Sequence, residues 1–370
     1  MNRKINAGII GATGMVGQRF IELLAEHPYF NIRVLAASPK SAGKKYHEAV
    51  GERWKMRKPI PPNVKDMVVF DAADVAKVTG MCDFVFCAVE IPGGTKDDVI
   101  KLEEAYAKTE TPVVSNNSAC RSIADVPMLI PEVNAAHIKI IEAQRKRLGT
   151  TRGFIVVKSN CSLMSYVPML TPLIKFGLDK VVVSTYQAIS GAGKTFDEMP
   201  EMIDNVIPYI GGTPTEEEKS EHEPLKIWGE ASMAHNAIIN AKGPIVTAQC
   251  VRVPVTDGHL ATVFMKFADT PPTKEEILRL WSEFKGEPQI LGLPSAPKQF
   301  ISYFEEINRP QTKLDRDLEN GMAISAGRLR EDTSGIFDYK FIGLSHNTLR
   351  GAAGGGVLAA ELLYRQGYFG

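Results

Sequence analysis

The stretch Ile5-Asn-Ala-Gly-Ile-Ile-Gly-Ala-Thr-Gly-Met-Val-Gly17 decides the fold of this chain of 370 residues. Residues 5–10 are a short apolar run typical of a buried strand, and glycines follow at positions 11, 14 and 17. Apolar residues then recur at helical spacing from Val16 to Leu24. Glycines between a strand and a helix let the backbone turn tightly and approach a pyrophosphate, which the helix N-terminus stabilises. The stretch therefore predicts a dinucleotide-binding βαβ unit; a glycine turn with only a structural role is the alternative.

The end of the second strand decides which dinucleotide is expected. A site for NAD usually places an acidic residue there, where it binds the ribose 2′-hydroxyl. The chain instead continues from the strand 32–37 with Ser38-Pro-Lys-Ser-Ala-Gly-Lys-Lys45, which contains no acid. Hydroxyl and ammonium groups suit a 2′-phosphate, because it carries negative charge and strong acceptor oxygens. We therefore predict NADP, bound here by Ser38, Lys40 and Ser41; a lysine-rich surface turn is the alternative.

The order of elements changes near residue 160. Before it, apolar strands at 5–10, 32–37, 84–89 and 112–114 alternate with helical segments, as in a parallel sheet with helices on its faces. After it, longer alternating strands indicate a mixed or antiparallel sheet. A glycine-rich loop leads into a helix of small residues over 351–363, which can pack closely on the first domain. We predict an α/β protein with a Rossmann-type dinucleotide-binding domain over residues 1–160, completed by residues 347–370. An α+β domain with a mixed sheet is expected over residues 161–346.

Cys161 lies where the two parts meet. The apolar run from Gly153 is expected to be a buried strand ending at Ser159-Asn-Cys-Ser162, and residues 163–176 are apolar enough to form a helix. At such a junction, unpaired backbone N–H groups and the helix dipole favour the thiolate form of a cysteine. The position predicts a nucleophile; a buried cysteine that only fills space is the alternative.

The composition argues against several classes of protein. Lys plus Arg and Asp plus Glu number 43 each, so no overall positive field indicates nucleic acid or an anionic membrane as a partner. The five cysteines are scattered without a Cys-x-x-Cys pair, so we expect reduced thiols and no metal site. No apolar run is long enough to span a bilayer, and no signal-peptide h-region precedes the first strand. We expect a cytoplasmic protein.

Seven ordered motifs extend over almost the whole chain. They are Gly11-Ala-Thr-Gly-Met-Val-Gly17, Ser115-Asn-Asn-Ser-Ala-Cys-Arg121, Ser159-Asn-Cys-Ser162, Gln187-Ala-Ile-Ser-Gly-Ala-Gly193, Glu223-Pro-Leu-Lys-Ile227, Arg252-Val-Pro-Val-Thr-Asp-Gly-His259 and Asn347-Thr-Leu-Arg-Gly351. In this order they resemble the motifs of aspartate-semialdehyde dehydrogenases, specifically the branch known from archaea and fungi. Seven motifs in one order are far more specific than any single motif.

The resemblance implies a catalytic centre of three residues. Cys161 would attack the acyl carbon and form a thioester. His259 would be the general acid–base, because an imidazole titrates near neutrality. Gln187 would orient the acyl-enzyme through an amide that both donates and accepts hydrogen bonds.

The resemblance also implies how the substrate is bound. Arg252 would bind the substrate carboxylate, since a planar guanidinium can contact both oxygens. Glu223 would meet the substrate ammonium group, and Lys226 would share its helix face. The phosphate would be bound by Lys226, Asn116 and Arg121.

For the cofactor, the resemblance implies contacts at both ends. The predicted cofactor residues of the glycine turn and of the nicotinamide end are Gly11, Thr13, Gly14, Met15, Val16, Ser190, Gly191 and Asn347. The implied activity is the NADPH-dependent reduction of β-aspartyl phosphate to aspartate β-semialdehyde with release of phosphate. The product would feed the synthesis of lysine through diaminopimelate, and of threonine, methionine and isoleucine. The family also implies a homodimer or homotetramer, formed through the second, catalytic domain.

Two other functions fit parts of the pattern. Malonyl-CoA reductase is similar to the same branch and uses the same thioester chemistry. It needs no partner for an amino group, so Glu223 favours the aspartyl substrate. The second alternative is a nucleotide-binding sensor without catalysis. Because Cys161, Gln187, Arg252 and His259 are all present, an enzyme is favoured.

Overall fold

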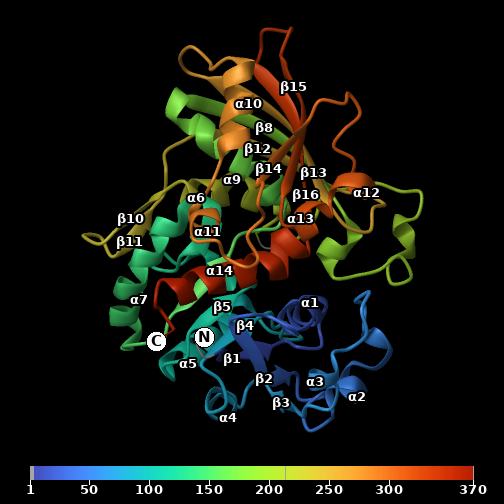
Figure 1. The fold of residues 1–370 in the computed structure, drawn as a ribbon, viewed down its shortest axis with the longest axis vertical. Coiled ribbons are helices and arrows are strands. Elements are labelled where there is room, and N and C mark those ends of the chain that lie inside the picture. Colours follow the sequence, from blue (N-terminus) through green and yellow to red (C-terminus); the bar gives the residue numbers. More distant parts are fainter. Residues whose placement is uncertain (1–3, 213, 370) are drawn as a thin grey trace.

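The first half of the chain forms a parallel seven-stranded sheet in the computed structural model, which describes residues 4–212 and 214–369 (Figure 1). Its strand order is β3-β2-β1-β4-β5-β7-β6. The strands are β1 (Ile5–Ile10), β2 (Phe30–Ala37), β3 (Val69–Asp71), β4 (Phe84–Cys87), β5 (Val113–Ser115), β6 (Met128–Leu129) and β7 (Ile155–Lys158). The order reverses between β1 and β4, and a parallel α/β sheet binds its ligand at such a reversal. The predicted Rossmann-type sheet is confirmed.

The connections of this sheet are mostly helical. They are α1 (Met15–Leu24), α2 (Tyr46–Val50), η1 (Gly51–Arg53), α3 (Pro62–Lys65), α4 (Val75–Thr79), α5 (Lys96–Lys108), η2 (Ala119–Ser122), α6 (Pro131–Asn134), η3 (Ala135–Ile140) and α7 (Ile141–Leu148). The first helix buries Phe20, Ile21 and Leu24 against the sheet, as its apolar spacing predicts.

The second half forms a mixed sheet, as predicted, and its seven strands have the order β14-β15-β16-β13-β8-β12-β9. Its strands are β8 (Leu178–Gln187), β9 (Ile207–Pro208), β12 (Ile245–Arg252), β13 (His259–Phe267), β14 (Ile301–Phe304), β15 (Ile324–Glu331) and β16 (Tyr339–Ser345), and a separate hairpin pairs β10 (Glu230–Ser232) with β11 (Ala237–Ile239). The helical segments are η4 (Ser162–Ser165), α8 (Val167–Leu170), η5 (Thr171–Phe176), η6 (Ile189–Ala192), η7 (Pro200–Met202), α9 (Glu216–Ile227), α10 (Lys274–Glu283), α11 (Glu287–Ile290), α12 (Thr312–Asp315), α13 (Leu318–Gly321), η8 (Leu349–Ala353) and α14 (Gly354–Arg365). Within the described ranges, no helix is long and apolar enough to cross a membrane.

The two faces of the mixed sheet differ. Residues on one face, such as Val183 and Val263, are fully buried in the core. On the other face, Tyr186 pairs with Leu260 across β8 and β13, and both side chains are partly exposed. Since side chains alternate between the faces of a strand, a single register decides which residues join the core.

Residues 163–176 do not form the single helix that we predicted. Most of them lie in three short segments, η4, α8 and η5, and Pro168 and Pro172 are the second residues of the last two. Proline is tolerated there but cannot continue a preceding helix, because its nitrogen has no hydrogen to donate. The nucleophile candidate therefore precedes one turn of 3-10 helix, and no long helix dipole acts on it.

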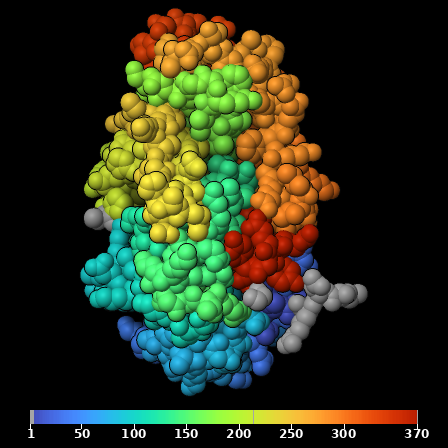
Figure 2. All heavy atoms as spheres, turned by 90° about the vertical axis from the view of Figure 1, so that its left-hand side faces the viewer, coloured from blue at the N-terminus to red at the C-terminus, as the bar shows by residue number. Residues whose placement is uncertain are grey.

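The C-terminal helix α14 returns to the first sheet, where Figure 1 shows it beside β5. Figure 2 shows the same red segment against the blue and green part of the chain. Its apolar residues share a core cluster with residues of β1 and α1. Two buried contacts hold this part of the chain: an ion pair just before α14, in which Arg350 Nη1 lies 2.8 Å from Glu132 Oε1, and a hydrogen bond in which His27 Nε2 lies 2.8 Å from Glu361 Oε1.

Candidate active site

The nucleophile and the histidine predicted from the sequence meet between the two sheets. Cys161 follows β7 of the first sheet, and His259 is the first residue of β13 in the second. Cys161 Sγ lies 3.4 Å from His259 Nε2. The thiol is partly exposed, whereas the imidazole is fully buried. This contact brings the two predicted catalytic groups within reach of one reacting carbon.

The surroundings of His259 favour a neutral imidazole. Burial, and then the positive charge of Arg252, lower the pKa of His259 to about 3. The backbone N–H of Ala188 donates to Nδ1 at 3.1 Å. Because Nδ1 accepts this bond, the ring hydrogen is on Nε2, which faces Cys161. The imidazole is thus arranged as a hydrogen-bond donor towards the sulfur.

The thiol of Cys161 does not have the lowered pKa that the sequence suggested. Burial, and then the charge of Glu216, raise the pKa of Cys161, while Lys158, Arg121 and Arg252 act in the opposite direction. The expectation was wrong because burial of the thiol opposes its ionisation, and only one turn of 3-10 helix follows the cysteine. Stabilisation of a thiolate depends instead on three cations from different parts of the chain.

Lys158 is one functional candidate that sequence reasoning missed. It is the last residue of β7, its side chain is 4% exposed, and its Nζ donates to the Ser159 carbonyl at 2.6 Å. Burial lowers the pKa of Lys158 to about 7, and the charge of Cys161 partly offsets that effect. The sequence signal that could have identified Lys158 is its position at the end of an apolar strand, three residues before the candidate nucleophile.

Gln187 and Arg252 end two adjacent parallel strands. They are register partners at the ends of β8 and β12, and both are buried. Arg252 Nη1 donates to the Ala188 carbonyl at 2.7 Å. A Cβ placed on Gly191 would lie 2.8 Å from Arg252 Nη1 and 3.1 Å from His259 Nε2, so this turn lies directly against both side chains. The sheet therefore brings these predicted residues to one site.

Glu216 and Lys219 lie beside Cys161 although the sequence analysis did not select them. Glu216 Oε1 accepts from Lys219 Nζ at 2.7 Å, and Oε2 accepts from Asn160 Nδ2 at 2.8 Å. Burial opposes the ionisation of Glu216, but Lys219 outweighs it and the pKa of Glu216 is lowered. The pair stands in the first turn of α9, whose capping residue Thr215 accepts from the Glu218 N–H at 3.1 Å. Acidic residues there are expected for any helix start, so they gave no functional signal.

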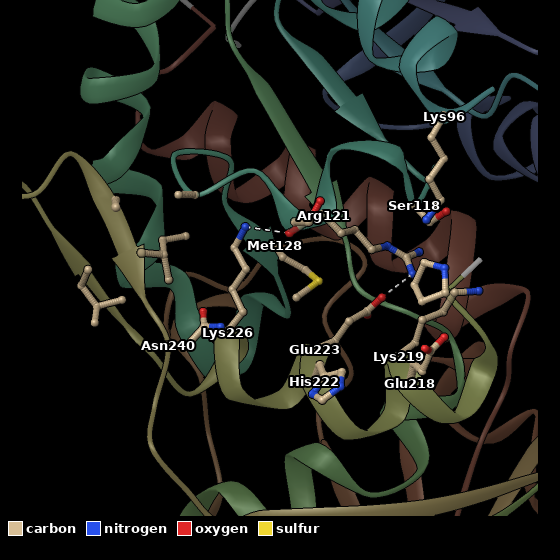
Figure 3. Close-up of a pocket in the computed structure, with 16 residues that line it drawn as sticks. Lys96, Ser118, Arg121, Met128, Glu218, Lys219, His222, Glu223, Lys226 and Asn240 are labelled. Atoms are coloured by element: carbon tan, nitrogen blue, oxygen red, sulfur yellow. Dashed lines mark hydrogen bonds and ion pairs between the residues drawn. The ribbon is translucent and has the colours of Figure 1, made fainter. Parts of the chain in front are cut away.

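Glu223 and Lys226, the predicted pair, bind other parts of the protein. Glu223 Oε1 lies 2.9 Å from Arg121 Nη1, and Oε2 accepts from the Asn160 N–H at 2.7 Å. Lys226 Nζ donates to the carbonyls of Arg121 and Ile123 at 2.7 and 2.6 Å. Figure 3 shows both contacts along the last turns of α9. Oε1 of Glu223 and the ammonium of Lys226 are thus engaged by the segment that carries Arg121, whereas Oε2 of Glu223 is engaged by the backbone of Asn160.

Asn116 is the predicted phosphate residue that the structure places apart from the others. Its side-chain oxygen is buried without a hydrogen-bond partner in the described part of the chain. A Cβ on Gly356 would lie 3.5 Å from that oxygen, so Asn116 faces the start of α14. Asn160, next to Cys161, is instead the amide that contacts Glu216.

The predicted cofactor turn has the geometry that a pyrophosphate requires. Gly11 has a φ of +85°, and a Cβ there would lie 2.2 Å from the Ala88 carbonyl oxygen. The turn leads into α1 at Gly14, and no side chain caps the helix. After β2, Lys40 is exposed and has no ion-pair partner among residues 4–212 and 214–369. These features fit a dinucleotide with an additional phosphate.

The predicted nicotinamide residues form one hydrogen-bonded group. Asn347 Nδ2 donates to Ser190 Oγ at 2.8 Å, and Asn347 Oδ1 accepts from the Gly258 N–H at 2.8 Å. Since Gly258 precedes His259 and Gly191 lies against it, this group borders the catalytic residues. The predicted nicotinamide residues and the nucleophile candidate therefore border the same site.

Comparisons with known proteins agree with this geometry. The family described as semialdehyde dehydrogenase, NAD binding domain, matches residues 6–141, and its dimerisation domain matches residues 170–350. The aspartate-semialdehyde dehydrogenase of Aspergillus fumigatus is 43% identical over 370 residues, covering 99% of this chain and 98% of the relative. That of Methanothermobacter thermautotrophicus is 41% identical, covering 97% and 99%. A crystal structure of aspartate semialdehyde dehydrogenase with NADP from Candida albicans is 39% identical, covers 99% of this chain and 100% of its own, and superposes with a TM-score of 0.86.

Proposed function

The chain belongs to the aspartate-semialdehyde dehydrogenase family, and from this premise we propose a role for each residue around Cys161. Its function is that of an NADP-dependent aspartate-semialdehyde dehydrogenase, an oxidoreductase of amino-acid biosynthesis. It interconverts β-aspartyl phosphate and aspartate β-semialdehyde. Identities of 40% or more over nearly the full chain favour this substrate over malonyl-CoA. A non-catalytic sensor is not favoured either.

The contact between Cys161 and His259 carries the proposed mechanism, with Sγ and Nε2 3.4 Å apart. Cys161 attacks the acyl carbon, a C–S bond forms, and phosphate leaves with the electron pair of the broken C–O bond. Bound NADPH supplies the hydride that reduces the thioester carbonyl. The neutral imidazole of His259 donates a hydrogen bond from Nε2 to the resulting alkoxide, which then collapses to the aldehyde and expels Cys161 as the thiolate. In this direction His259 stabilises the alkoxide through the hydrogen on Nε2, and its acid–base role stays a prediction.

For the substrate, we propose that two residues of the first turn of α9 replace the predicted pair. Glu216 binds the substrate ammonium group, because its carboxylate contacts the side chains of both Asn160 and Gln187 and its charge acts on Cys161. Lys219 and Arg121 bind the phosphate. Arg252 binds the carboxylate, and its guanidinium lies against the same turn as His259. Glu223 orients Arg121 instead of binding substrate.

The cofactor residues remain those predicted from the sequence. We propose that the glycine turn binds the pyrophosphate of NADP through Gly11, Thr13, Gly14, Met15 and Val16. The segment after β2 binds the 2′-phosphate through Ser38, Lys40 and Ser41. The nicotinamide is bound by Ser190, Gly191 and Asn347. The acid-free segment after β2 supports selection of the 2′-phosphate.

The assembly and the location of the protein are also proposals. The dimerisation-domain match over residues 170–350 includes the partly exposed sheet face that carries Tyr186 and Leu260. We propose that two copies pair through this face, in a homodimer or a homotetramer, and that the protein is cytoplasmic. We also propose two domains. The dinucleotide-binding domain comprises residues 1–160 and 347–370, and the catalytic domain comprises residues 161–346.

A pair of assays tests the proposed function. Phosphate-dependent reduction of NADP with aspartate semialdehyde is compared with oxidation of NADPH by malonyl-CoA. We expect activity in the first assay, and its loss in Cys161→Ala but not in the matched variant Cys82→Ala. Activity with malonyl-CoA alone would overturn the substrate, and an active Cys161→Ala enzyme would overturn the thioester.

A further inference from the structure

A cavity of about 720 Å³ lies between α9, the η2 segment and the β11 strand (Figure 3). One end is apolar and includes Met128 and Ile238. The other end is lined by cations, of which Lys96, Arg121 and Lys219 are the ones used below. Figure 3 shows Lys96 extending from the start of α5 towards Ser118, on the side of the cavity where Arg121 lies.

The cationic end of the cavity is linked to the residues around Cys161 by a series of contacts. Arg121 Nε donates to the Lys158 carbonyl at 2.9 Å, and Lys219 pairs with Glu216 at 2.7 Å. Glu216 in turn accepts from Asn160, the residue before Cys161. An anion held between Arg121 and Lys219 would therefore lie next to the group that reacts.

Lys96 differs from the other cations of the cavity because it is not paired. Arg121 is paired with Glu223, Lys219 with Glu216, and Lys226 donates to two carbonyls. Lys96 makes no ion pair and no side-chain hydrogen bond with any residue in the described ranges. Burial, and then the charges of Lys219 and Arg121, lower the pKa of Lys96. Glu223 and Glu218 act on this pKa in the opposite direction. The ammonium of Lys96, without an ion-pair partner in the described ranges, can bind an anion at this end of the cavity.

The position of Lys96 does not help its own helix. It is the first residue of α5, where the helix dipole disfavours a cation. The start of the helix is already capped, since Thr95 accepts from the Asp98 N–H and Asp98 accepts from the Thr95 N–H. A lysine at this position therefore needs a reason other than the stability of the helix.

We propose that Lys96 is a phosphate-binding residue of the reaction, which contacts the phosphoryl group together with Arg121 and Lys219 at the mouth of this cavity. The inference rests on the proposed function. When Cys161 displaces the phosphate, the leaving group takes the electron pair of the C–O bond and carries about two negative charges. In the reverse direction a phosphate oxygen attacks the thioester and expels the thiolate. In both directions, a third cation would bind the free phosphate better than Arg121 and Lys219 do alone.

The experiment measures steady-state kinetics of semialdehyde oxidation with phosphate, aldehyde and NADP each varied in turn. For Lys96→Met we expect KM for phosphate to rise about tenfold or more, since a hydrogen bond to a charged group is lost. KM for the aldehyde and for NADP should change less than about twofold. Lys96→Arg should restore most of the phosphate affinity. Lys101→Met, on the same helix but outside the cavity lining, is the matched control and should resemble the unmodified enzyme.

Two further measurements separate a binding role from a structural one. KM for phosphate should increase less steeply with ionic strength in Lys96→Met than in the unmodified enzyme, because one charge is missing. The unfolding temperature of the variant should be equal or higher, because an unfavourable charge leaves the helix start. An unchanged KM for phosphate, or a rise in KM for NADP instead, would overturn the role of Lys96. Absence of phosphate-dependent activity in the unmodified enzyme would overturn the proposed function itself.

Discussion

Helix α9 carries the spacing Glu-x-x-Lys twice, and its two copies face different parts of the protein. In the first turn, Glu216 and Lys219 pair with each other beside Asn160. In the last turns, Glu223 and Lys226 are engaged by the η2 segment and the residue that follows it, and Glu223 also accepts from the backbone N–H of Asn160. Residues three apart share a helix face, but the spacing does not say what that face meets. We propose that the first copy binds the substrate and that the second copy holds the segment that carries Arg121.

The largest expected effect comes from removing the charge of the first copy. Glu216→Gln should lower kcat/KM for aspartate semialdehyde by about 100-fold or more, since loss of one partner from a buried pair costs about 3–5 kcal/mol. Lys219 would then lose its ion-pair partner, and the substrate ammonium group would lose the carboxylate that binds it. Steady-state kinetics with varied semialdehyde measures this loss.

The matched control for this prediction is Glu223→Gln. It should affect KM for phosphate more than KM for the semialdehyde, because Glu223 holds Arg121 and not the amino group. A larger loss of semialdehyde affinity in Glu223→Gln than in Glu216→Gln would restore the pair predicted from the sequence and refute the present assignment.

Replacing the lysines of the two copies, Lys219 and Lys226, should have smaller effects, and the two variants should differ in KM for phosphate. Lys219→Met should raise KM for phosphate about tenfold, as expected for the loss of a charge-assisted hydrogen bond. Lys226→Met should leave that KM within about threefold and instead lower the free energy of unfolding by about 1–3 kcal/mol, because two buried carbonyls lose their donor. Kinetics and urea unfolding of both variants test the contrast, and the reverse pattern would exchange their roles.

The smallest expected effect is a pH dependence of stability that Lys226 contributes. Burial lowers the pKa of Lys226 from its usual 10.5 to about 8 in the folded protein. Between these two values the unfolded chain binds a proton at this residue that the folded chain does not, so the free energy of unfolding increases as pH rises through the window. Urea unfolding at several pH values should show a smaller increase in Lys226→Met. An identical slope in both proteins would mean that this ammonium stays charged when folded.

Much of the fold followed from short-range patterns in the sequence. The glycine turn after residues 5–10, the apolar strands before residue 160 and the alternating strands after it correspond to observed elements. The single helix predicted for 163–176 is the exception, because Pro168 and Pro172 interrupt it. An apolar composition indicated burial there, but local proline geometry decided the backbone.

The site was predicted less completely than the fold. Motifs identified Cys161, His259, Gln187 and Arg252, which the structure brings together. They did not identify Lys158 or the first turn of α9. In the sequence, a lysine after an apolar run indicates only that the strand ends. Acidic residues at the start of a helix are expected in any protein, because they interact favourably with the helix dipole. Neither residue type signals function until its neighbours are known.

The sequence by itself indicated the family, the two kinds of sheet and the candidate nucleophile, because periodicity, turn chemistry and ordered motifs depend on residues that are near one another in the chain. Only the tertiary structure decided the charge environment of that nucleophile. Cys161 and His259 are 98 positions apart in the chain, and Asn160 and Glu216 are 56 apart. Such pairs depend on how two sheets pack, and burial and distance between their side chains set the protonation of each group.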